Sequence, residues 1–298
     1  MKIAAVQLDA QGDVADNLDA AAGYVIDAAD AGARFVALRE VFHLRVGRGA
    51  GQRYLDTARD FDAAVARFAK LAATHSITLL MGSITEPSAD PQRVYNTSVL
   101  LGPGGETLAR YRKVHLFDVE VGDVTERESK RFMPGDEVVA AEAGLGIVGL
   151  TICYDLRFPE LFRSLALSGA QLITVPANFT KPTGEAHWMT LLRARAIENG
   201  LFIVAPNQCG SFTGPEGGGF TSYGHSAVID PWGRVLLEMD DQPGVGYAEI
   251  DLTEVERVRA AVPALQNRRP DVYGLCNPID THVRFPYLAS CLMTYRKE

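Results

Sequence analysis

The segment 146–160, Gly-Ile-Val-Gly-Leu-Thr-Ile-Cys-Tyr-Asp-Leu-Arg-Phe-Pro-Glu, contains the change of pattern that decides the fold. Residues 146–152 are almost all apolar, and a run of this length predicts a buried strand. Polar residues begin after Cys153, and Pro159 opens a helical pattern over 159–168, because proline is favoured in the first turn of a helix. In a sheet covered by helices, ligands bind where the strands end. Cys153 is therefore expected at a ligand-binding edge.

The same alternation of short apolar runs and helical patterns continues in both directions. Before this segment, the sequence predicts helices at 16–31 and 61–75 and strands at 2–8, 35–38, 77–84, 95–101 and 106–111. After it, the sequence predicts a helix at 184–199 and strands at 172–175, 201–205, 222–229, 235–238 and 245–250. Strands separated by helices, with hairpins added, indicate an α/β protein with mixed sheets.

The domain organisation is predicted from the lack of a linker in the sequence. No Pro/Ser-rich stretch interrupts the pattern, so we predict one domain over residues 1–274. Residues 275–298 show no clear period. We predict that they form a C-terminal tail, which either takes part in subunit contacts or lies at the periphery.

Composition and charge exclude several classes of function. The chain has 298 residues and a formal charge of -8, which argues against nucleic acid as a partner, because phosphate binding usually needs a basic face. The longest apolar runs are too short for a membrane span, and the N-terminus lacks the apolar core of a secretion signal, so a cytoplasmic protein is expected. The four cysteines form no C-x-x-C pair, and no metal site, disulfide framework or cofactor is predicted.

Cys153 is the candidate nucleophile. A thiol between an apolar strand and a helix start lies beside exposed N–H groups, which favour the thiolate and can bind an oxyanion. Free cysteine is also among the most buried residue types, so a structural role is the alternative for Cys153 taken alone.

Two further ionisable residues follow predicted strands. Glu40 comes directly after the apolar run 35–38 and Arg39, and a partly desolvated carboxylate is a suitable base for a thiol. Lys113 closes the predicted strand at 106–112, and its ammonium group can stabilise a developing oxyanion. Taken singly, each has a simpler explanation, because most glutamates and lysines are solvated surface residues. All three residues are expected at strand ends, and together they indicate a catalytic centre.

The segments around these residues occur in a fixed order along the chain. They are 38–40 (Leu-Arg-Glu), 112–117 (Arg-Lys-Val-His-Leu-Phe) and 152–160 (Ile-Cys-Tyr-Asp-Leu-Arg-Phe-Pro-Glu). They resemble the corresponding segments of the nitrilase superfamily of carbon–nitrogen hydrolases, whose members use a Glu–Lys–Cys triad. The likeness extends from Lys2 to about Gly274 without a large insertion.

The resemblance implies a fold and a set of catalytic residues. The implied fold is a four-layer α-β-β-α sandwich of two mixed sheets, assembled as a homodimer or a larger homo-oligomer. The implied triad is Glu40, Lys113 and Cys153, and Glu128 matches a second glutamate that is common in the family. Glu128 is expected to orient Lys113 or to assist proton transfer.

One position departs from the family pattern. Proline usually precedes the catalytic glutamate, and here that position is Arg39. Losing the fixed φ of proline changes how Glu40 is presented, and an inward guanidinium would alter the charge around it. Arg39 is the only sequence feature that favours the alternative of a non-catalytic binding member of the superfamily.

The resemblance also implies how substrate is handled. Lys113 and the backbone N–H of Tyr154 are expected to stabilise the oxyanion formed when Cys153 attacks an amide carbonyl. Arg157 is the candidate partner for a substrate carboxylate, because guanidinium–carboxylate pairing is bidentate. The alternative for this arginine is an ion pair with one of the nearby acidic residues, Asp155 or Glu160.

One loop further along the chain is expected to line the pocket by its family position. It is the loop at 178–187, with Phe179 and Thr183 as the named residues. The alternative for both is a turn that leads into the helix predicted at 184–199.

Several later segments narrow the resemblance to one branch. The segments at 183–188, 192–199, 222–226, 230–233 and 268–273 are similar to those of deaminated-glutathione amidases and omega-amidases. The expected reaction is hydrolysis of a small carboxylate-bearing amide to an acid and ammonia, with deaminated glutathione as the first candidate substrate. Amides such as 2-oxoglutaramate and N-carbamoyl amino acids are the alternatives, and nitriles follow them.

A different enzyme class also remains open at this stage. In a papain-like hydrolase, Cys153 would be paired with His187 or His225. That reading predicts that replacing the histidine abolishes activity and that Lys113→Ala is tolerated.

Overall fold

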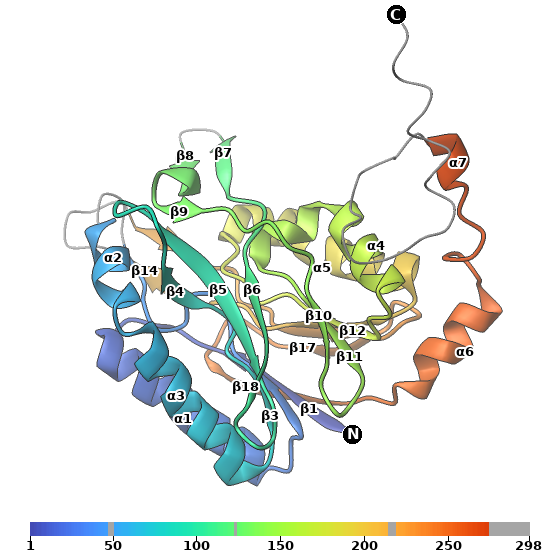
Figure 1. Ribbon diagram of the computed structural model, residues 1–298, viewed down its shortest axis with the longest axis horizontal. Helices are drawn as coiled ribbons and strands as arrows, with labels where there is room; N and C mark the ends of the chain where they lie inside the picture. The colour runs from blue at the N-terminus through green and yellow to red at the C-terminus, as the bar shows by residue number, and fades with distance from the viewer. Residues whose placement is uncertain (47–50, 122–123, 214–218, 274–298) are drawn as a thin grey trace, which may run out of the picture.

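The computed structural model describes residues 1–46, 51–121, 124–213 and 219–273. Over these residues the chain forms two sheets packed face to face, with helices on the outer side of each (Figure 1). The predicted tail at 275–298 lies outside the described residues. Within the described ranges, no helix is long and apolar enough to cross a bilayer.

The first sheet is built from the N-terminal half of the chain and one late strand. Its strands are β1 Lys2–Gln7, β2 Phe35–Ala37, β3 Thr78–Leu80, β4 Ile84–Pro87, β5 Val94–Leu101, β6 Thr107–Arg112, β9 Phe132–Met133 and β18 Gly244–Glu249. The order is β18-β1-β2-β3-β5-β4, with β6 and β9 also paired to β5. Strands β1, β2 and β3 are parallel, and β18 and β5 run antiparallel to their neighbours β1 and β3. The sheet is therefore mixed, as predicted.

The second sheet repeats this plan in the C-terminal half. Its strands are β10 Ala140–Glu142, β11 Ile147–Leu150, β12 Leu172–Thr174, β13 Phe202–Ala205, β16 Ala227–Ile229 and β17 Val235–Glu238, in that order. Strands β11, β12 and β13 are parallel, and the outer pairs are antiparallel. Two small ribbons lie outside the main sheets, β7 Asp118–Val121 with β8 Val124–Arg127 and β14 Ser211–Phe212 with β15 Phe220–Thr221.

Seven α-helices and two 3₁₀ turns are present in the described ranges. They are α1 Val14–Asp30, α2 Gln52–Ala58, α3 Phe61–His75, α4 Pro159–Leu167, α5 Lys181–Asn199, α6 Thr253–Ala261 and α7 Pro270–Tyr273, with η1 Glu128–Lys130 and η2 Cys153–Arg157. Helix α3 has the bounds that the sequence predicts. It stops at Ser76, whose left-handed backbone (φ 51°) lets its N–H bond back to the last helical turn.

The four layers follow from strict side-chain alternation along the strands. In and just after β2, Phe35 and Ala37 join the core shared with the second sheet, whereas Val36 and Leu38 join the core under α1 and α3. On the other side, α4 and α5 cover the second sheet. The predicted α-β-β-α sandwich is confirmed, because the central strands of the first sheet are apolar on both faces and each face is buried.

Three of the predicted elements differ in their bounds from the structure. The single strand predicted at 77–84 is two strands, β3 and β4, because the chain bends at Gly82. A Cβ atom there would lie 1.9 Å from the Arg39 carbonyl oxygen. The strand predicted from residue 222 begins only at Ala227, since Gly224 (φ 72°) and His225 (φ 54°) interrupt the extended backbone. Helix α5 begins at Lys181, one turn earlier than predicted.

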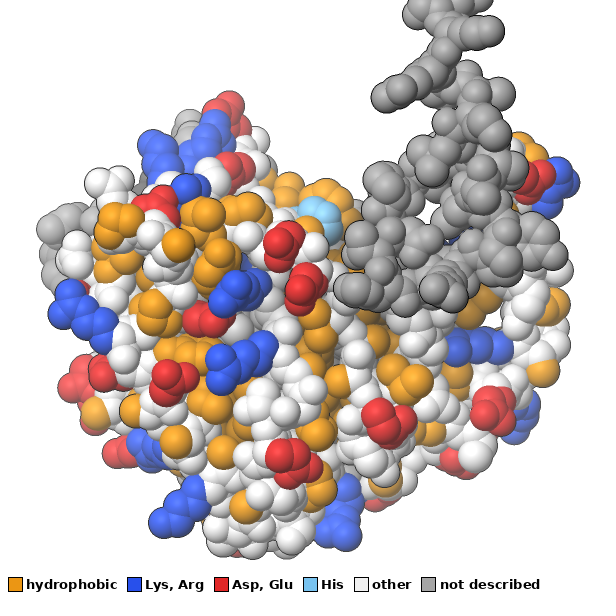
Figure 2. All heavy atoms as spheres, viewed as in Figure 1, with side chains coloured by type: hydrophobic (Ala, Val, Ile, Leu, Met, Phe, Trp, Pro, Cys, Tyr) orange, Lys and Arg blue, Asp and Glu red, His pale blue; other side chains and the backbone are white. Residues whose placement is uncertain are grey.

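The charged side chains on the surface are of both signs. On the face drawn in Figure 2, basic and acidic side chains are interspersed and no continuous basic area is seen.

Candidate active site

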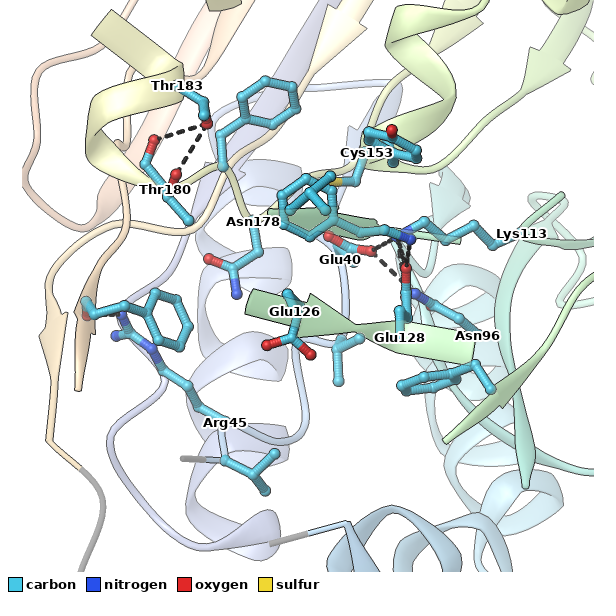
Figure 3. A pocket seen from close by; sticks show the side chains of 18 of the residues that line it. Glu40, Arg45, Asn96, Lys113, Glu126, Glu128, Cys153, Asn178, Thr180 and Thr183 are labelled. Atoms are coloured by element: carbon cyan, nitrogen blue, oxygen red, sulfur yellow. Dashed lines mark hydrogen bonds and ion pairs between the residues drawn. The ribbon is translucent and has the colours of Figure 1, made fainter. Parts of the chain in front are cut away.

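A cavity of about 710 Å³ opens where strands of both sheets end (Figure 3). Its walls include Glu40 after β2, Asn96 from β5, Lys113 after β6, Glu128 from η1 and Cys153 from η2. The four predicted catalytic residues, although far apart in sequence, therefore share one cavity.

The turn that carries Glu40 is held from beneath by Arg39. The Arg39 side chain is fully buried, and it donates to the Glu40 carbonyl oxygen (2.5 Å) and, more weakly, to the Phe42 carbonyl oxygen (3.4 Å). Val41 has φ 44°, which is rare for a β-branched residue, and its N–H donates to the Ser83 hydroxyl (2.8 Å). Arg39 thus satisfies carbonyls of a strained turn, and burial lowers its pKa to about 9.

Lys113 lies between two carboxylates. Its Nζ is 2.9 Å from Glu40 Oε1 and 3.1 and 3.0 Å from the two Glu128 oxygens, and its side chain is 2% exposed. Burial alone would lower the pKa of Lys113. The negative charges of Glu128 and Glu40 outweigh burial and hold the pKa well above its usual value. Lys113 is therefore a fixed positive charge inside the cavity.

The two carboxylates are in turn fixed by other donors. Asn96 Nδ2 donates to Glu40 Oε1 (3.0 Å), and the Phe117 backbone N–H donates to Glu128 Oε2 (2.6 Å). Glu128 is buried, and this burial raises its pKa against the opposing effect of Lys113. The orientation of the carboxylates is set before any ligand binds.

Cys153 occupies a left-handed backbone conformation, φ 49°, between β11 and α4. Its N–H donates to the Pro176 carbonyl oxygen (2.9 Å), so this amide is not free to bind an oxyanion. The Glu40 carboxylate and the backbone N–H of Asn178 lie close enough to the Cys153 sulfur to change the pKa of the thiol in opposite directions. The geometry brings together a nucleophile and a base.

The protonation of Cys153 depends on opposing effects. Burial and the neighbouring Glu40 carboxylate raise the pKa of the Cys153 thiol well above its usual value. Lys113 and the Asn178 N–H act in the opposite direction, as expected of N–H groups near the sulfur. A thiol with a raised pKa needs a base, which is the role that the sequence predicts for Glu40.

A buried carboxylate two residues after the nucleophile holds the cysteine turn. Asp155 accepts from Tyr111 Oη (2.7 Å) and the Ile152 N–H (2.8 Å) on one oxygen. Its other oxygen accepts from the His115 backbone N–H (3.1 Å) and lies 2.8 Å from His115 Nδ1. Asp155 therefore connects the cysteine turn to the segment that follows Lys113.

All four predicted substrate-binding residues line the cavity. They are Tyr154, Arg157, Phe179 and Thr183. Neither ion pair offered as the alternative for Arg157 occurs, because Asp155 is bound elsewhere and no carboxylate partner of Arg157 is found among the described residues. Instead, the Arg157 guanidinium lies over the rings of Tyr154 (5.9 Å) and Phe179 (5.4 Å) and beside His187 Nδ1 (3.3 Å). The hydroxyl of Thr183 bonds within its own turn to Thr180.

The histidines of the papain-like alternative lie outside the cavity wall. His187 contacts Arg157, and His225 stacks on Tyr223, and neither is among the described residues that line the cavity. The base within reach of the thiol is Glu40.

Sequence reasoning missed the roles of two residues of this site. Asn96 lines the cavity, and Asp155 lies beneath it, where it was considered only as a partner of Arg157. Asn178 lines the cavity as part of the loop expected there, at 178–187. A polar residue inside an apolar strand, such as Asn96 in β5, was the available signal.

Comparison with known proteins agrees with this geometry. A family model described as carbon–nitrogen hydrolase matches residues 2–260. The chain belongs to the carbon–nitrogen hydrolase family. Deaminated glutathione amidase of Rattus norvegicus is 39% identical over 93% of this chain and 85% of its own length. Omega-amidase NIT2 of Homo sapiens is 34% identical over 92% of this chain and 97% of its own length.

One solved relative has a covalent adduct at its active-site cysteine. A glutamate-to-glutamine mutant of the amidase from Nesterenkonia sp. AN1, with acrylamide added at the active-site cysteine, is 30% identical to this hydrolase. It superposes with a TM-score of 0.75 over 91% of this chain and 97% of its own. The predicted membership of the nitrilase superfamily and the predicted amidase-type hydrolysis of a non-peptide carbon–nitrogen bond are confirmed.

Proposed function

We propose that this hydrolase cleaves small carboxylate-bearing amides through a thioester at Cys153, and that deaminated glutathione is its substrate. The proposal rests on one observation above all. The Cys153 thiol lies beside the Glu40 carboxylate, which shares Lys113 with Glu128, in a cavity whose wall also carries Arg157. Catalytic roles are assigned to Glu40, Lys113, Cys153 and Glu128 on this basis.

The first half of the reaction makes the acyl-enzyme. Glu40 removes the thiol proton as the Cys153 sulfur attacks the amide carbonyl carbon, which explains why a raised thiol pKa is compatible with reactivity. The oxyanion is stabilised by Lys113 and by the Tyr154 N–H, since backbone N–H groups in the first turn of a helix lack partners within that helix. The protonated Glu40 then gives its proton to the leaving nitrogen, and the carbon–nitrogen bond breaks.

The second half restores the enzyme. Glu40, again a carboxylate, takes a proton from water, and the hydroxide attacks the thioester carbonyl. The same two donors stabilise the second oxyanion, and the Cys153 sulfur leaves with the proton returned by Glu40. Glu128 keeps Lys113 in place throughout, because its carboxylate is fixed by the Phe117 N–H.

The identity of the leaving group depends on the substrate. A primary amide such as 2-oxoglutaramate releases ammonia. Deaminated glutathione carries a secondary amide at the corresponding position, so its leaving group is an amine and not the ammonia expected from sequence. In both cases the acid half retains a 2-oxo carboxylate, and Arg157, which has no carboxylate partner among the described residues, is the group proposed to bind it.

The size of the cavity favours the larger substrate. A volume of about 710 Å³ is in the range that holds a drug-sized ligand, and 2-oxoglutaramate would fill only part of it. The names of the two relatives support the same pair of candidates, deaminated glutathione first and the omega-amide second. N-carbamoyl amino acids remain the next alternative.

The experiment measures the acid and nitrogen products from deaminated glutathione, 2-oxoglutaramate, an N-carbamoyl amino acid and an aliphatic nitrile. We expect the highest kcat/KM with deaminated glutathione and no product from Cys153→Ala with any substrate. Lys113→Ala separates this triad from a cysteine–histidine pair, because we expect it to abolish turnover. Turnover by Lys113→Ala close to that of the wild type would contradict the assignment.

Assembly and location belong to the proposal as well. We propose a homodimer or a larger homo-oligomer in the cytoplasm, with residues 275–298 as a tail outside the 1–274 domain. Light scattering on the full chain and on a chain ending at residue 274 tests the assembly. A monomer in both cases would contradict it.

A further inference from the structure

Asn178 is a cavity residue whose side-chain amide is held in one orientation. It lies between β12 and α5, directly before Phe179, and its backbone N–H contacts the Cys153 sulfur. Figure 3 shows its side chain projecting into the cavity. A polar group in the same cavity as the nucleophile is placed to contact the acyl part of a substrate whose scissile carbonyl lies at Cys153.

The orientation follows from a chain of hydrogen bonds that starts at Arg45. Arg45 Nη2 donates to the Ser222 hydroxyl (2.9 Å), and an arginine can only donate. The Ser222 oxygen therefore accepts, and its single proton is directed to Asn178 Oδ1 at 2.6 Å. Because Oδ1 is engaged, the Asn178 Nδ2 group is the part of the amide left for a ligand, and no partner for it is found among the described residues.

Arg45 is itself well fixed, which makes this chain of contacts rigid. Its side chain is 2% exposed, pairs with Asp9 (2.8 Å) and donates to the carbonyl oxygens of Cys209 (3.3 Å) and Gly210 (2.9 Å). Ser222 is also buried. An amide oriented by two buried groups is expected to keep its donor facing the cavity.

The charges around the cavity favour an acceptor on the substrate and disfavour an ammonium group. Among the described residues, each carboxylate that lines the cavity contacts a lysine or arginine: Glu40 and Glu128 share Lys113, Glu126 pairs with Arg131, and Glu185 lies 3.9 Å from Lys181. Arg157 lines the same cavity without a carboxylate partner in the described part of the chain. A 2-ammonium group would find no unpaired anion among these residues and would face the donor of Asn178.

We propose that Asn178 is a specificity-determining residue that donates a hydrogen bond to the 2-oxo oxygen of the substrate, and thereby selects 2-oxo acid amides over their 2-amino counterparts. Ser222 and Arg45 are the positioning residues that set the direction of this donor. The inference rests on the proposed function, and it assigns the discrimination between oxo and amino substrates to one side chain.

The test uses two matched pairs of substrates that differ only at this group: deaminated glutathione with glutathione, and 2-oxoglutaramate with glutamine. The ratio of kcat/KM within each pair is measured for the wild type, Asn178→Ala, Asn178→Asp and Ser222→Ala. Asn267→Asp, an exposed residue outside the cavity, controls for the added negative charge.

We expect the ratio to fall in a defined order. Asn178→Ala removes one donor and lowers kcat/KM for the oxo member about tenfold, with little change for the amino member. Asn178→Asp replaces the donor by an acceptor and lowers the ratio by about 100-fold. Ser222→Ala releases the amide orientation and lowers the ratio by a smaller factor, and Asn267→Asp leaves it unchanged. An equal fall for both members of each pair would overturn the inference.

A binding measurement separates this inference from the proposed function. Alkylation of Cys153 by iodoacetamide is followed by peptide mass spectrometry in the presence of 2-oxoglutarate or glutamate. Protection by 2-oxoglutarate alone, weakened in Asn178→Asp, supports the inference even if no amide in the panel is hydrolysed. Equal protection by both acids, or protection by neither, would overturn it.

Discussion

The turn that carries Glu40 and the turn that carries Cys153 occupy equivalent places in the two halves of the molecule. Each follows a parallel strand, β2 or β11, and each contains one non-glycine residue with a left-handed backbone, Val41 (φ 44°) or Cys153 (φ 49°). Strained residues of this kind persist only where surrounding contacts determine them.

The two turns are held by groups of opposite charge. Beneath the Glu40 turn, the guanidinium of Arg39 donates to two backbone carbonyl oxygens. Beneath the Cys153 turn, the carboxylate of Asp155 accepts from two backbone N–H groups and two side chains. The first turn presents the carbonyl oxygens of Glu40 and Phe42 to Arg39, whereas the second turn presents the Ile152 N–H to Asp155.

The contact between Glu40 and Cys153 joins the two turns, so loosening either one should change the same base–nucleophile pair. The Cys153 turn has the stronger support, because four groups contact the Asp155 carboxylate whereas Arg39 contacts two carbonyl oxygens. We therefore expect larger effects on the cysteine side.

Among the residues that hold the two turns, the largest effect is expected from Asp155→Ala. It leaves the Ile152 and His115 N–H groups and the Tyr111 hydroxyl without their acceptor, and we expect a loss of about 3–5 kcal/mol in the free energy of unfolding. A shift of the cysteine turn should also lower kcat by about 100-fold. Urea unfolding and steady-state kinetics measure both quantities, and Asp155→Asn serves if the alanine variant does not fold.

The matched control for this variant is Asp230→Ala. Asp230 is also buried and accepts from the Trp232 and Arg234 N–H groups, in a turn that does not line the cavity. It should lose stability with kcat unchanged. A similar kcat for Asp155→Ala and Asp230→Ala would contradict the claim that Asp155 holds the nucleophile in position.

Arg39→Met should have the next largest effect. The carbonyl oxygens of Glu40 and Phe42 lose their donor, while a buried charge is also removed, so we expect a net loss of about 1–3 kcal/mol in the free energy of unfolding. Glu40 retains its contacts with Lys113 and Asn96, and the fall in kcat should be about tenfold, smaller than for a displaced nucleophile. Urea unfolding and steady-state kinetics again measure the two effects.

Arg259→Met is the control for Arg39→Met. Arg259 donates to the Asn199 and Ala170 carbonyl oxygens on the side of α6, away from the cavity wall. We expect Arg259→Met to lower the free energy of unfolding and to leave kcat unchanged.

Arg39→Pro restores the residue that is usual in the family. This variant should keep its activity if the proline fixes the turn as Arg39 does. Loss of activity in Arg39→Pro would show that the arginine has a role of its own.

Glu40→Gln should change thiol reactivity in the opposite direction to turnover. The Glu40 carboxylate helps to raise the pKa of Cys153, so its neutralisation should lower that pKa and increase the thiolate fraction at any pH below it. We expect alkylation of Cys153 at about pH 8 to accelerate about 3- to 10-fold, since one pKa unit corresponds to a tenfold change in thiolate, while turnover falls.

Iodoacetamide labelling of Cys153 across a pH series measures this change. Glu86→Gln is the matched control, because Glu86 is a buried carboxylate paired with Arg112 and is not among the groups that affect Cys153. Slower labelling in Glu40→Gln than in wild type would contradict the charge argument.

The smallest effect is expected from Tyr111→Phe. Its hydroxyl donates to Asp155 and accepts from the Val114 N–H, but Asp155 keeps three other donors. We expect a loss of about 1–2 kcal/mol in the free energy of unfolding and a change in kcat of less than about threefold. Thermal unfolding measures the first, with Tyr247→Phe on the surface as the control. A kcat as low as that of Asp155→Ala would mean that the phenol, and not the carboxylate, fixes the turn.

The sequence by itself determined the class of fold and the position of the key residues along it. Period-two apolar runs and period-3.6 helical patterns are local properties, so the parallel strands, α3 and the strand-to-helix change at Cys153 were predictable. The order of the Glu40, Lys113 and Cys153 segments identified the family before any contact was known. Helices α2, α6 and α7 were missed, because they are short and carry few apolar residues.

Only the tertiary structure decided which groups meet. Asp155 binds Tyr111 and His115, and Arg157 is left without a carboxylate among the described residues. Asn178 is oriented by Ser222, which comes after helix α5 in the chain. Hydrogen-bond direction and desolvation depend on distances between segments far apart in sequence, and these distances exist only once the two sheets have closed on one another.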